Sequence, residues 1–367
     1  MTRLPNTLFV GRQRTAVTWY RCALPAEFLG CDWISVDDRS GTLEQVTGRD
    51  GVEIPESEWA SYDVVVLQQP RGADWVKRIR SLQASGTVVL FEIDDYVQAV
   101  RKAADHDFRA VEDREAVRGL ELAMRVADGI ICSTEWLARR YRAFNGRAYV
   151  CRNGLDLGRY ALTRPPRDAP VIGWAGATGH RNAVEPWLHA IVDVMRERPE
   201  VGFVSIGQPF DRLVAAQVGE ERCVGVPFTM LESYPAAMTL MDIAIAPAGK
   251  SQFFRGKSDL RFLEAGALGI ATVADPGVYP TVEHGVTGLH AATPAEAGEH
   301  LLALVDDPGR REAIGAAARA YVRRERDMRV MSRQWEAVLH DVTGDPTELP
   351  VPLVAAPAAA ARRRSRR

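Results

Sequence analysis

The sequence lacks both a long apolar run and an excess of charge of either sign. Its 367 residues include 46 Lys+Arg and 48 Asp+Glu, a formal net charge of -2. This balance provides no global positive field for a polyanion such as DNA, so any nucleic-acid contact would have to be local. No apolar stretch approaches the ~20 residues that span a bilayer, and the N-terminus lacks the charged start and apolar run of a signal peptide. These absences predict a cytoplasmic protein without a membrane span.

Cysteine is scarce and unpaired in sequence. The 5 cysteines are scattered along the chain as Cys22, Cys31, Cys132, Cys151 and Cys223. No C-x-x-C pair is present, so neither a zinc site nor a dithiol redox centre is indicated. The odd number favours reduced, partly buried thiols.

What the sequence does have is a regular alternation of short β-branched runs with segments of helical period. The hydrophobic fraction of 46% is ample for real cores, and the length exceeds that of a typical single domain. The pattern therefore predicts two α/β domains with parallel sheets covered by helices. The expected strands are residues 8–10, 33–36, 64–67, 88–93, 129–132, 171–174, 201–206, 243–246 and 270–274. The expected helices are residues 73–82, 115–126, 134–142, 183–196, 258–268, 294–305, 310–324 and 328–340.

A boundary between the domains is expected where this alternation breaks. The break falls at Asn153-Gly154-Leu155-Asp156 and is followed by a polar, proline-bearing stretch over residues 163–170. We therefore expect an N-terminal domain over residues 1–155, a linker over 156–170 and a C-terminal domain over 171–327. A helix over 328–342 and a disordered Ala/Pro/Arg tail over 343–367 complete the division. The basic end of the tail is expected either to touch anionic surfaces or only to aid solubility.

The densest group of candidate binding residues lies between residues 247 and 289. Lys257 directly precedes Ser258, a residue type that favours the N-cap of a helix. A positive side chain and free helix N–H groups would then converge at one point, which suits a diphosphate. Glu264 follows two turns later, ~10 Å along the helix at ~1.5 Å per residue, on nearly the same face. A nucleotide could lie along this helix, with its ribose on Glu264. An amphipathic surface helix with solvated charges explains the same residues equally well.

A second candidate segment is the glycine-rich loop over residues 173–181, which follows one expected strand and precedes a helix. Its glycines, including Gly176, allow a phosphate to approach the backbone beside Thr178. Their spacing is GxxGxxG rather than GxGxxG, which disfavours a dinucleotide. His180 is expected to be structural rather than catalytic, and Arg181 is a basic residue next to the loop.

Two carboxylates end an apolar strand in the first half of the chain. Asp94 and Asp95 follow the run over residues 88–93, at the edge of a parallel sheet where ligands bind. They are expected either to contact an acceptor, to hold a metal ion, or only to cap a helix and contact solvent. Tyr20 and Arg21 are further candidates for the same side of a cleft.

One segment resembles the donor site of family 4 (group 1) glycosyltransferases. Lys257-Ser258-Asp259-Leu260-Arg261-Phe262-Leu263-Glu264, followed by Ala267-Leu268-Gly269-Ile270, is similar to members reading KSDLKFLE and then ALG. The stretches over residues 153–156, 242–247 and 278–289 resemble further motifs of the family, in the same order. The resemblance implies a GT-B fold: two facing Rossmann-like domains with parallel sheets, joined by a C-terminal helix that crosses back to the N-terminal domain.

The resemblance also implies an activity and roles for single residues. A sugar would move from a nucleotide-sugar donor to an acceptor hydroxyl, with retention and without a bound metal or other cofactor. The implied catalytic residues are Lys257, Arg181, Asp94 and Asp95. The implied donor-binding residues are Gly176, Thr178, Arg255, Lys257, Ser258 and Glu264. The sequence leaves open the donor's base and sugar, and whether the acceptor is a glycan, lipid, protein, small molecule or modified DNA.

The sequence departs from the family's pattern at one position. The family often carries two glutamates separated by seven residues, and Gly256 stands where the first would be. The role of that glutamate would pass to Arg255 or Lys257, or be lost. A catalytically inactive GT-B binding or scaffold subunit and a nucleotide-sugar epimerase therefore stay open as alternatives.

Overall fold

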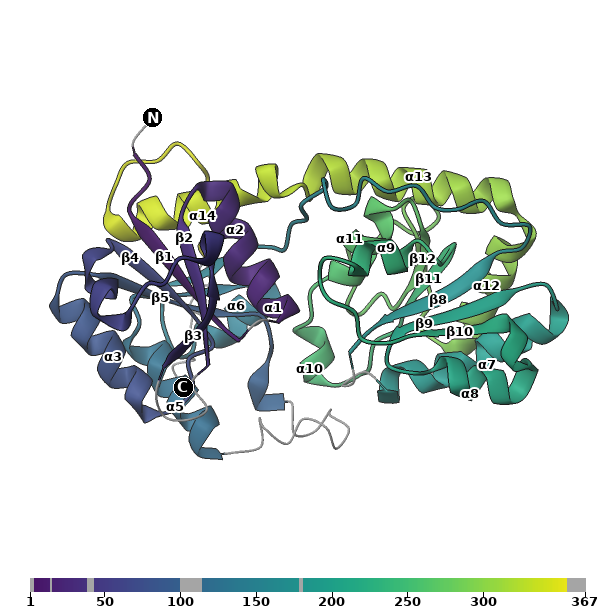
Figure 1. Cartoon of the computed structure of the whole chain (residues 1–367), viewed down its shortest axis with the longest axis horizontal. Coiled ribbons are helices and arrows are strands. Elements are labelled where there is room, and N and C mark those ends of the chain that lie inside the picture. The colour runs from purple at the N-terminus through teal and green to yellow at the C-terminus, as the bar shows by residue number, and fades with distance from the viewer. Residues whose placement is uncertain (1–2, 14, 38–42, 100–113, 178–180, 355–367) are drawn as a thin grey trace, which may run out of the picture.

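Two α/β domains lie side by side in the computed structural model of the protein (Figure 1). The structure describes residues 3–13, 15–37, 43–99, 114–177 and 181–354. The described residues form a seven-stranded sheet of order β3-β2-β1-β4-β5-β6-β7 and a six-stranded sheet of order β10-β9-β8-β11-β12-β13. Every strand pairing is parallel except that of β2 with β3. The predicted alternation of strands and helices is thus confirmed.

The central strands of the N-terminal sheet are almost entirely buried. Its strands are β1 (Thr7–Arg12), β2 (Asp32–Asp37), β3 (Glu44–Gly48), β4 (Val64–Gln68), β5 (Val88–Ile93), β6 (Gly129–Cys132) and β7 (Ala148–Val150). One face packs on α3 (Ala73–Ala84), α5 (Arg114–Val126) and α6 (Glu135–Tyr141). The other packs on α1 (Ala16–Thr18), a π-helical turn (Trp19–Ala23) and α2 (Leu24–Leu29). Burial on both faces explains the continuous apolar runs of β4 and β5. The edge strand β3 reads EQVTG and gave no such signal.

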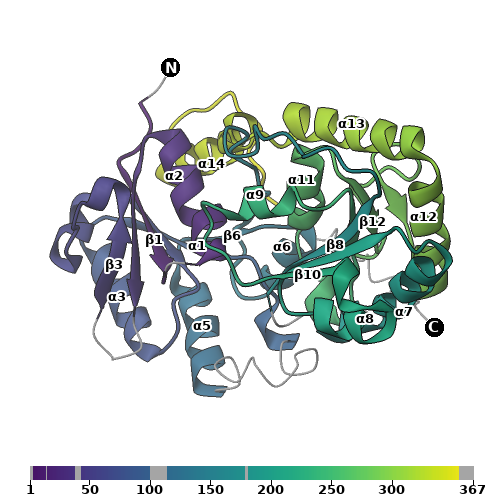
Figure 2. The ribbon, with the colours of Figure 1, turned by 45° about the vertical axis from the view of Figure 1, so that its right-hand side comes forward.

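The C-terminal sheet is likewise covered on both faces (Figure 2). Its strands are β8 (Val171–Gly176), β9 (Gly202–Gly207), β10 (Cys223–Val226), β11 (Ile243–Ala246), β12 (Ala271–Ala274) and β13 (Leu289–His290). One face packs on α7 (Arg181–Glu197), α8 (Asp211–Val218) and α12 (Pro294–Asp306). The other packs on α9 (Tyr234–Met238), α11 (Leu260–Ala267) and α13 (Pro308–Glu325), while the short α10 (Gln252–Arg255) faces the N-terminal domain. In both sheets the strand order reverses beside the first strand, β1 or β8, and ligands bind at such points in open α/β sheets.

The last helix, α14 (Met328–Thr343), belongs in space to the N-terminal domain. It packs on α2, and the rings of Trp335 and Phe9 meet edge to face with centroids 5.6 Å apart. Figure 1 shows α13 lying along the C-terminal domain and α14 along the N-terminal one. The chain therefore crosses back as predicted.

None of the described helices is long and apolar enough to cross a membrane.

A buried ion pair lies where the domains meet. The Nε of Arg21 donates to Oε1 of Glu92 over 2.6 Å, and both side chains are buried. The Nη1 of Arg21 also donates to the carbonyl oxygen of Cys151 and to Oδ1 of Asn153. The guanidinium lies 5.0 Å from the ring centroid of Trp335. Arg21 thus connects β5, the start of the interdomain connection and α14.

The sequence predicts a disordered tail that begins at residue 343, and this starting point is wrong. Residues 344–354 are described, and their end runs along β7, where Val150 N donates to Pro352 O over 2.9 Å and Val354 N to Ala148 O over 2.8 Å. As an edge strand, β7 offers unpaired backbone groups that this segment satisfies. Residues 355–367 lie outside the described residues.

Shortening the chain tests this contact. A chain that ends at Val354 should melt like the full-length protein, whereas one that ends at Val342 should melt a few degrees lower because the edge of β7 loses its partner. Thermal denaturation followed by circular dichroism measures the difference. Equal melting of all three chains would show that residues 343–354 contribute nothing to stability.

Candidate functional site

A cavity of about 400 Å³ lies between the two domains, at the carboxyl ends of both sheets. We call it the interdomain cavity. It is walled by α1 and the end of β5 on one side, and by the ends of β8, β9 and β11 together with α11 on the other. Its polar lining residues are Thr15, Tyr20, Arg21, Asp94, Asn153, Thr229, Glu232, Tyr234, Lys257, Ser258, Arg261, Glu264 and Tyr279.

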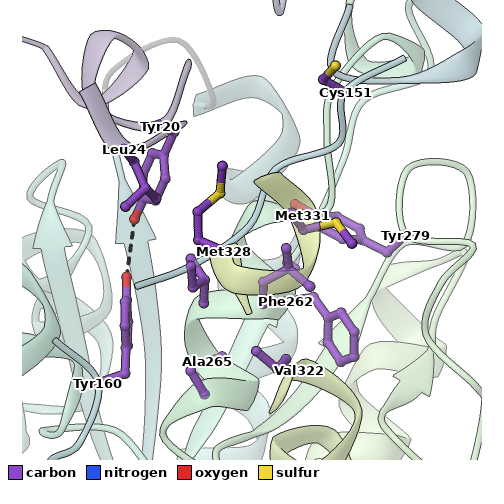
Figure 3. Close-up of a cluster of buried hydrophobic side chains, with 14 of the residues drawn as sticks. Tyr20, Leu24, Cys151, Tyr160, Phe262, Ala265, Tyr279, Val322, Met328 and Met331 are labelled. Carbon is purple, nitrogen blue, oxygen red and sulfur yellow. Dashed lines mark hydrogen bonds between the residues drawn. The ribbon is translucent and has the colours of Figure 1, made fainter. Parts of the chain in front are cut away.

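Glu264 on α11 joins the two domains at one end of this cavity. Only 4% of the residue is exposed, and its Oε1 accepts a 2.6 Å hydrogen bond from the hydroxyl of Tyr20. Its Oε2 accepts from the hydroxyl of Tyr234 over 3.3 Å. Figure 3 shows the hydroxyl of Tyr20 meeting that of Tyr160, 3.1 Å away. Burial raises the pKa of Glu264 to about 7. A carboxylate has about four lone-pair sites, so two hydroxyl donors leave room for further donors from a ligand.

Lys257 also lines the cavity and reaches across to the N-terminal domain. Its Nζ lies 2.5 Å from Oδ1 of Asp95 in the N-terminal domain and 4.4 Å from the ring centroid of Phe253. Both charged side chains are partly exposed, at 24% for Lys257 and 21% for Asp95. The Lys257 ammonium therefore stands at the cavity wall, held by a carboxylate with which an anionic ligand would compete.

The expected helix N-cap at Ser258 is wrong. The helix α11 begins at Leu260, and Asp259 occupies the N-cap position. The Oγ of Ser258 instead accepts a 2.9 Å hydrogen bond from Nδ2 of Asn153. Asp259 is in turn held by Arg326, whose Nη2 donates to Oδ2 over 2.6 Å. The shift has a physical reason: the side chains of both residues are bound to the connections between the domains.

Asp94 and Asp95 separate into two environments. Asp94 lines the interdomain cavity, and its Oδ1 accepts a 2.6 Å hydrogen bond from Nε2 of Gln69. Burial, together with the charges of Asp95 and Glu92, raises the pKa of Asp94 to about 7. Asp94 thus faces the cavity, while Asp95 carries the contact to Lys257.

Arg261 is a basic residue of the site that the sequence reasoning missed. It lies four residues after Lys257, in the first turn of α11, and its Nε donates to the carbonyl oxygen of Ala175 over 3.1 Å. Its guanidinium lies 5.5 Å from the ring centroid of Trp174. A Cβ at Gly176 would stand 2.8 Å from Nη2 of Arg261, so this glycine is needed for the close approach. The four-residue spacing from Lys257 was the available signal.

Two predicted site residues that the structure describes, Arg181 and Arg255, do not line the cavity. Arg181 begins α7 on the surface, where its Nε lies 2.5 Å from Oε1 of Glu185. Arg255 ends α10 and is exposed, outside the cavity wall. Thr178 lies outside the described residues, as does His180. The basic groups that do line the cavity are Arg21, Lys257 and Arg261.

The packing around Gly256 explains the missing glutamate. A Cβ at this position would lie 2.9 Å from Cδ2 of Leu137 and 3.3 Å from Cβ of Tyr96, both in the N-terminal domain. The Oγ1 of Thr134 also donates to the carbonyl oxygen of Gly256 over 3.4 Å. The N-terminal domain packs directly on this position, so a longer side chain would require Leu137 and its neighbours to move.

An apolar segment borders the cavity on the side of the C-terminal domain. Phe228 is 75% exposed and Met230 is 59% exposed, and both line the cavity. Between them, Oγ1 of Thr229 is buried in the cavity wall without a hydrogen-bond partner. Exposed apolar side chains beside an unsatisfied hydroxyl are suited to a flat ring that has a polar edge.

Within the described part of the chain, no group of three or more His, Cys, Asp or Glu side chains is arranged to hold a metal ion.

Comparison with known proteins identifies the fold. Residues 184–337 match a family described as "Glycosyl transferase-like". No curated protein sequence matches the chain. Sucrose-phosphate synthase from Thermosynechococcus elongatus superposes with a TM-score of 0.66 at 13% identity, covering 92% of this chain and 99% of that one. HepE of Anabaena, solved with UDP and glucose, has a TM-score of 0.62 at 14% identity, covering 92% and 100%. A glycosyltransferase from Rickettsia africae has a TM-score of 0.63 at 13% identity, covering 94% and 100%. The fold is GT-B, as predicted.

Proposed function

We propose that the protein is a glycosyltransferase that moves a sugar from a nucleotide-sugar donor to an acceptor hydroxyl. The observation that carries the proposal is the convergence of Lys257, Arg261 and Glu264, from α11 and the residues just before it, on a cavity that Asp94 lines from the other domain. The match of residues 184–337 to a glycosyl transferase-like family supports it. The fold is shared with HepE, whose complex contains UDP and glucose, and this likeness supports the choice of donor class.

The donor in this proposal lies along α11. Its diphosphate is held between Lys257 and Arg261, two cations four residues apart that offset its charge. Its ribose hydroxyls donate to Glu264. Its base occupies the apolar end beside Phe228, where Oγ1 of Thr229 supplies a hydrogen-bonding group.

The chemistry in this proposal is stabilisation of the leaving group. The bond between the anomeric carbon and the diphosphate oxygen breaks, and negative charge builds on the diphosphate. The ammonium of Lys257 then leaves the carboxylate of Asp95 and contacts the diphosphate instead. The guanidinium of Arg261 offsets the charge of the diphosphate from its other side. The acceptor oxygen attacks the anomeric carbon, and its proton passes to the departing phosphate, with Asp94 orienting the hydroxyl.

We propose retention of configuration and no requirement for a metal, as the family 4 resemblance implies, and the cytoplasm as the location.

Donor turnover tests this function. The purified protein is incubated with a panel of nucleotide-sugars and candidate acceptors, with and without EDTA, and nucleoside diphosphate release is measured by chromatography. We expect release from at least one donor, undiminished by EDTA. Complete loss in EDTA, restored by Mn²⁺ or Mg²⁺, would contradict the metal-free mechanism. Conversion of the donor to an isomeric nucleotide-sugar would identify an epimerase, and binding without any turnover would identify a binding subunit.

The variant Glu264→Gln is expected to weaken donor binding more than catalysis. The ribose is remote from the breaking bond and is held alike in the ground and transition states, so donor KM should rise by the equivalent of about 1–3 kcal/mol while kcat changes little. Because the pKa of Glu264 is about 7, the wild-type carboxyl is itself largely protonated at pH 6. The KM difference should therefore be larger at pH 8 than at pH 6. Steady-state kinetics at both pH values, with Glu185→Gln on α7, outside the cavity, as the control, measures it. A difference that does not change with pH would contradict the role of the ionised carboxylate.

A further inference from the structure

We propose that the protein has a second ligand site, which binds a phosphate group in a basic hollow of the N-terminal domain. The hollow has a volume of about 650 Å³, within the ~300–1,000 Å³ typical of small-molecule sites. It is bounded by α6, the end of β7, α14 and residues 352–354. None of its lining residues lines the interdomain cavity.

The charge of this hollow is strongly one-sided. Its lining contains Arg139, Arg142 and Arg152, with Glu135 as the one carboxylate among the described lining residues. Arg152 is paired with Glu135. Arg142 donates from Nη1 to the carbonyl oxygen of Val354 over 2.8 Å, which leaves its other guanidinium N–H groups for a ligand. Three guanidinium groups against one carboxylate leave an excess of two positive charges.

The walls of the hollow are held in place before any ligand arrives. The backbone N–H of Arg152 donates to Oε1 of Gln334 over 2.8 Å, which ties the end of β7 to α14. Residues 352–354 are fixed by their backbone pairing with β7. The arginines therefore surround a preformed space, so a ligand need not order the walls when it binds.

The chemistry of the lining selects phosphate. Planar guanidinium groups match phosphate oxygens with paired N–H donors, and they are less strongly hydrated than lysine. Val150, Pro352 and Leu353 add an apolar wall, which suits a phosphate carried on an organic group.

Isothermal titration with inorganic pyrophosphate tests the site. The titration uses a full-length chain that carries Lys257→Ala, so that the interdomain cavity contributes little heat. We expect one equivalent to bind, and Arg139→Gln to weaken binding about tenfold, the loss expected for one charge-assisted hydrogen bond. Glu135→Gln should strengthen binding severalfold, because it removes the one carboxylate and releases Arg152. The matched control is Arg140→Gln, on the same helix but over the ring of Trp136 and outside the hollow, and it should leave affinity unchanged.

The same variants distinguish a free phosphate from a lipid headgroup. Co-sedimentation with phosphatidylcholine vesicles containing phosphatidic acid, lost in Arg139→Gln and kept in Arg140→Gln, would identify a lipid-borne phosphate. Pyrophosphate binding without co-sedimentation would identify a soluble ligand. The proposal would be overturned if the protein neither bound pyrophosphate nor co-sedimented with the vesicles. It would also be overturned if Arg139→Gln and Arg140→Gln lost binding equally, because the arginines would then contribute only to the general positive charge of the surface. None of these results depends on whether the interdomain cavity binds a nucleotide-sugar.

Discussion

Replacing Lys257 by alanine is expected to lower kcat by about 100- to 1,000-fold, the loss that follows when one group stabilising a developing negative charge is removed. The ammonium matters more as charge builds on the departing diphosphate than when the intact donor binds, so kcat should fall together with kcat/KM. Steady-state kinetics measures both parameters. Lys257→Arg, which keeps the charge, should recover part of the rate, and the exposed Lys77→Ala should behave as wild type. Wild-type kcat in Lys257→Ala would show that this residue does not act on the leaving group.

The contact between Lys257 and Asp95 raises an alternative explanation that a second variant separates. If Lys257 acted only by holding the two domains together through Asp95, then Asp95→Asn would lose as much activity as Lys257→Ala. The pair is partly exposed and lies at a cleft, where such pairs contribute roughly 0–1 kcal/mol to stability. We therefore expect Asp95→Asn to keep far more activity than Lys257→Ala, with similar melting temperatures for both variants. Equal losses in the two variants would favour the purely structural role.

Replacing Arg21 by methionine is expected to lower the free energy of unfolding by about 3–5 kcal/mol, the cost of leaving a buried charge without its partner. Glu92 is fully buried, and burial raises its pKa while Arg21 opposes that rise. The variant also removes the donors to Cys151 and Asn153. Denaturant unfolding followed by circular dichroism measures the loss, and the double variant Arg21→Met with Glu92→Met should recover a large part of it.

The pH dependence of this loss has a definite sign. Without Arg21, the pKa of Glu92 rises further, so the buried carboxyl takes up a proton as the pH falls and its charge disappears. The cost of Arg21→Met should therefore be smaller at pH 5 than at pH 8. A variant as stable as wild type at both pH values would show that Glu92 does not carry a charge in the folded protein.

The parts of the fold that were predictable are those whose signal is local. The strands β4 and β5 are buried on both faces and appear as continuous apolar runs, and the helices from α12 to α14 follow the helical period. The turn that carries Tyr20 and Arg21 gave no comparable signal. Its side chains were recognised as candidates for the cleft, but its π-helical geometry was not predicted.

The parts of the site that were missed depend on contacts between distant segments. The hydrogen bond from Tyr20 to Glu264 joins residues 244 positions apart, so no spacing rule predicts it. Ser258 appeared to be a helix cap, but its hydroxyl is engaged by Asn153 in the connection between the domains. The first turn of α11 is thus set by tertiary contacts rather than by the preference of one residue for the N-cap.

Binding of a nucleoside diphosphate in the interdomain cavity along α11 is tested most directly by calorimetric titration. UDP, GDP, ADP, CDP and TDP are each titrated into the wild type, Lys257→Ala, Glu264→Gln and Arg181→Ala. We expect stoichiometric binding of at least one nucleotide, weakened about tenfold or more by Lys257→Ala and by Glu264→Gln. We expect no change in Arg181→Ala, because that side chain lies on the surface beside Glu185. Tight binding that survives Lys257→Ala and Glu264→Gln but is lost in Arg181→Ala would contradict binding along α11.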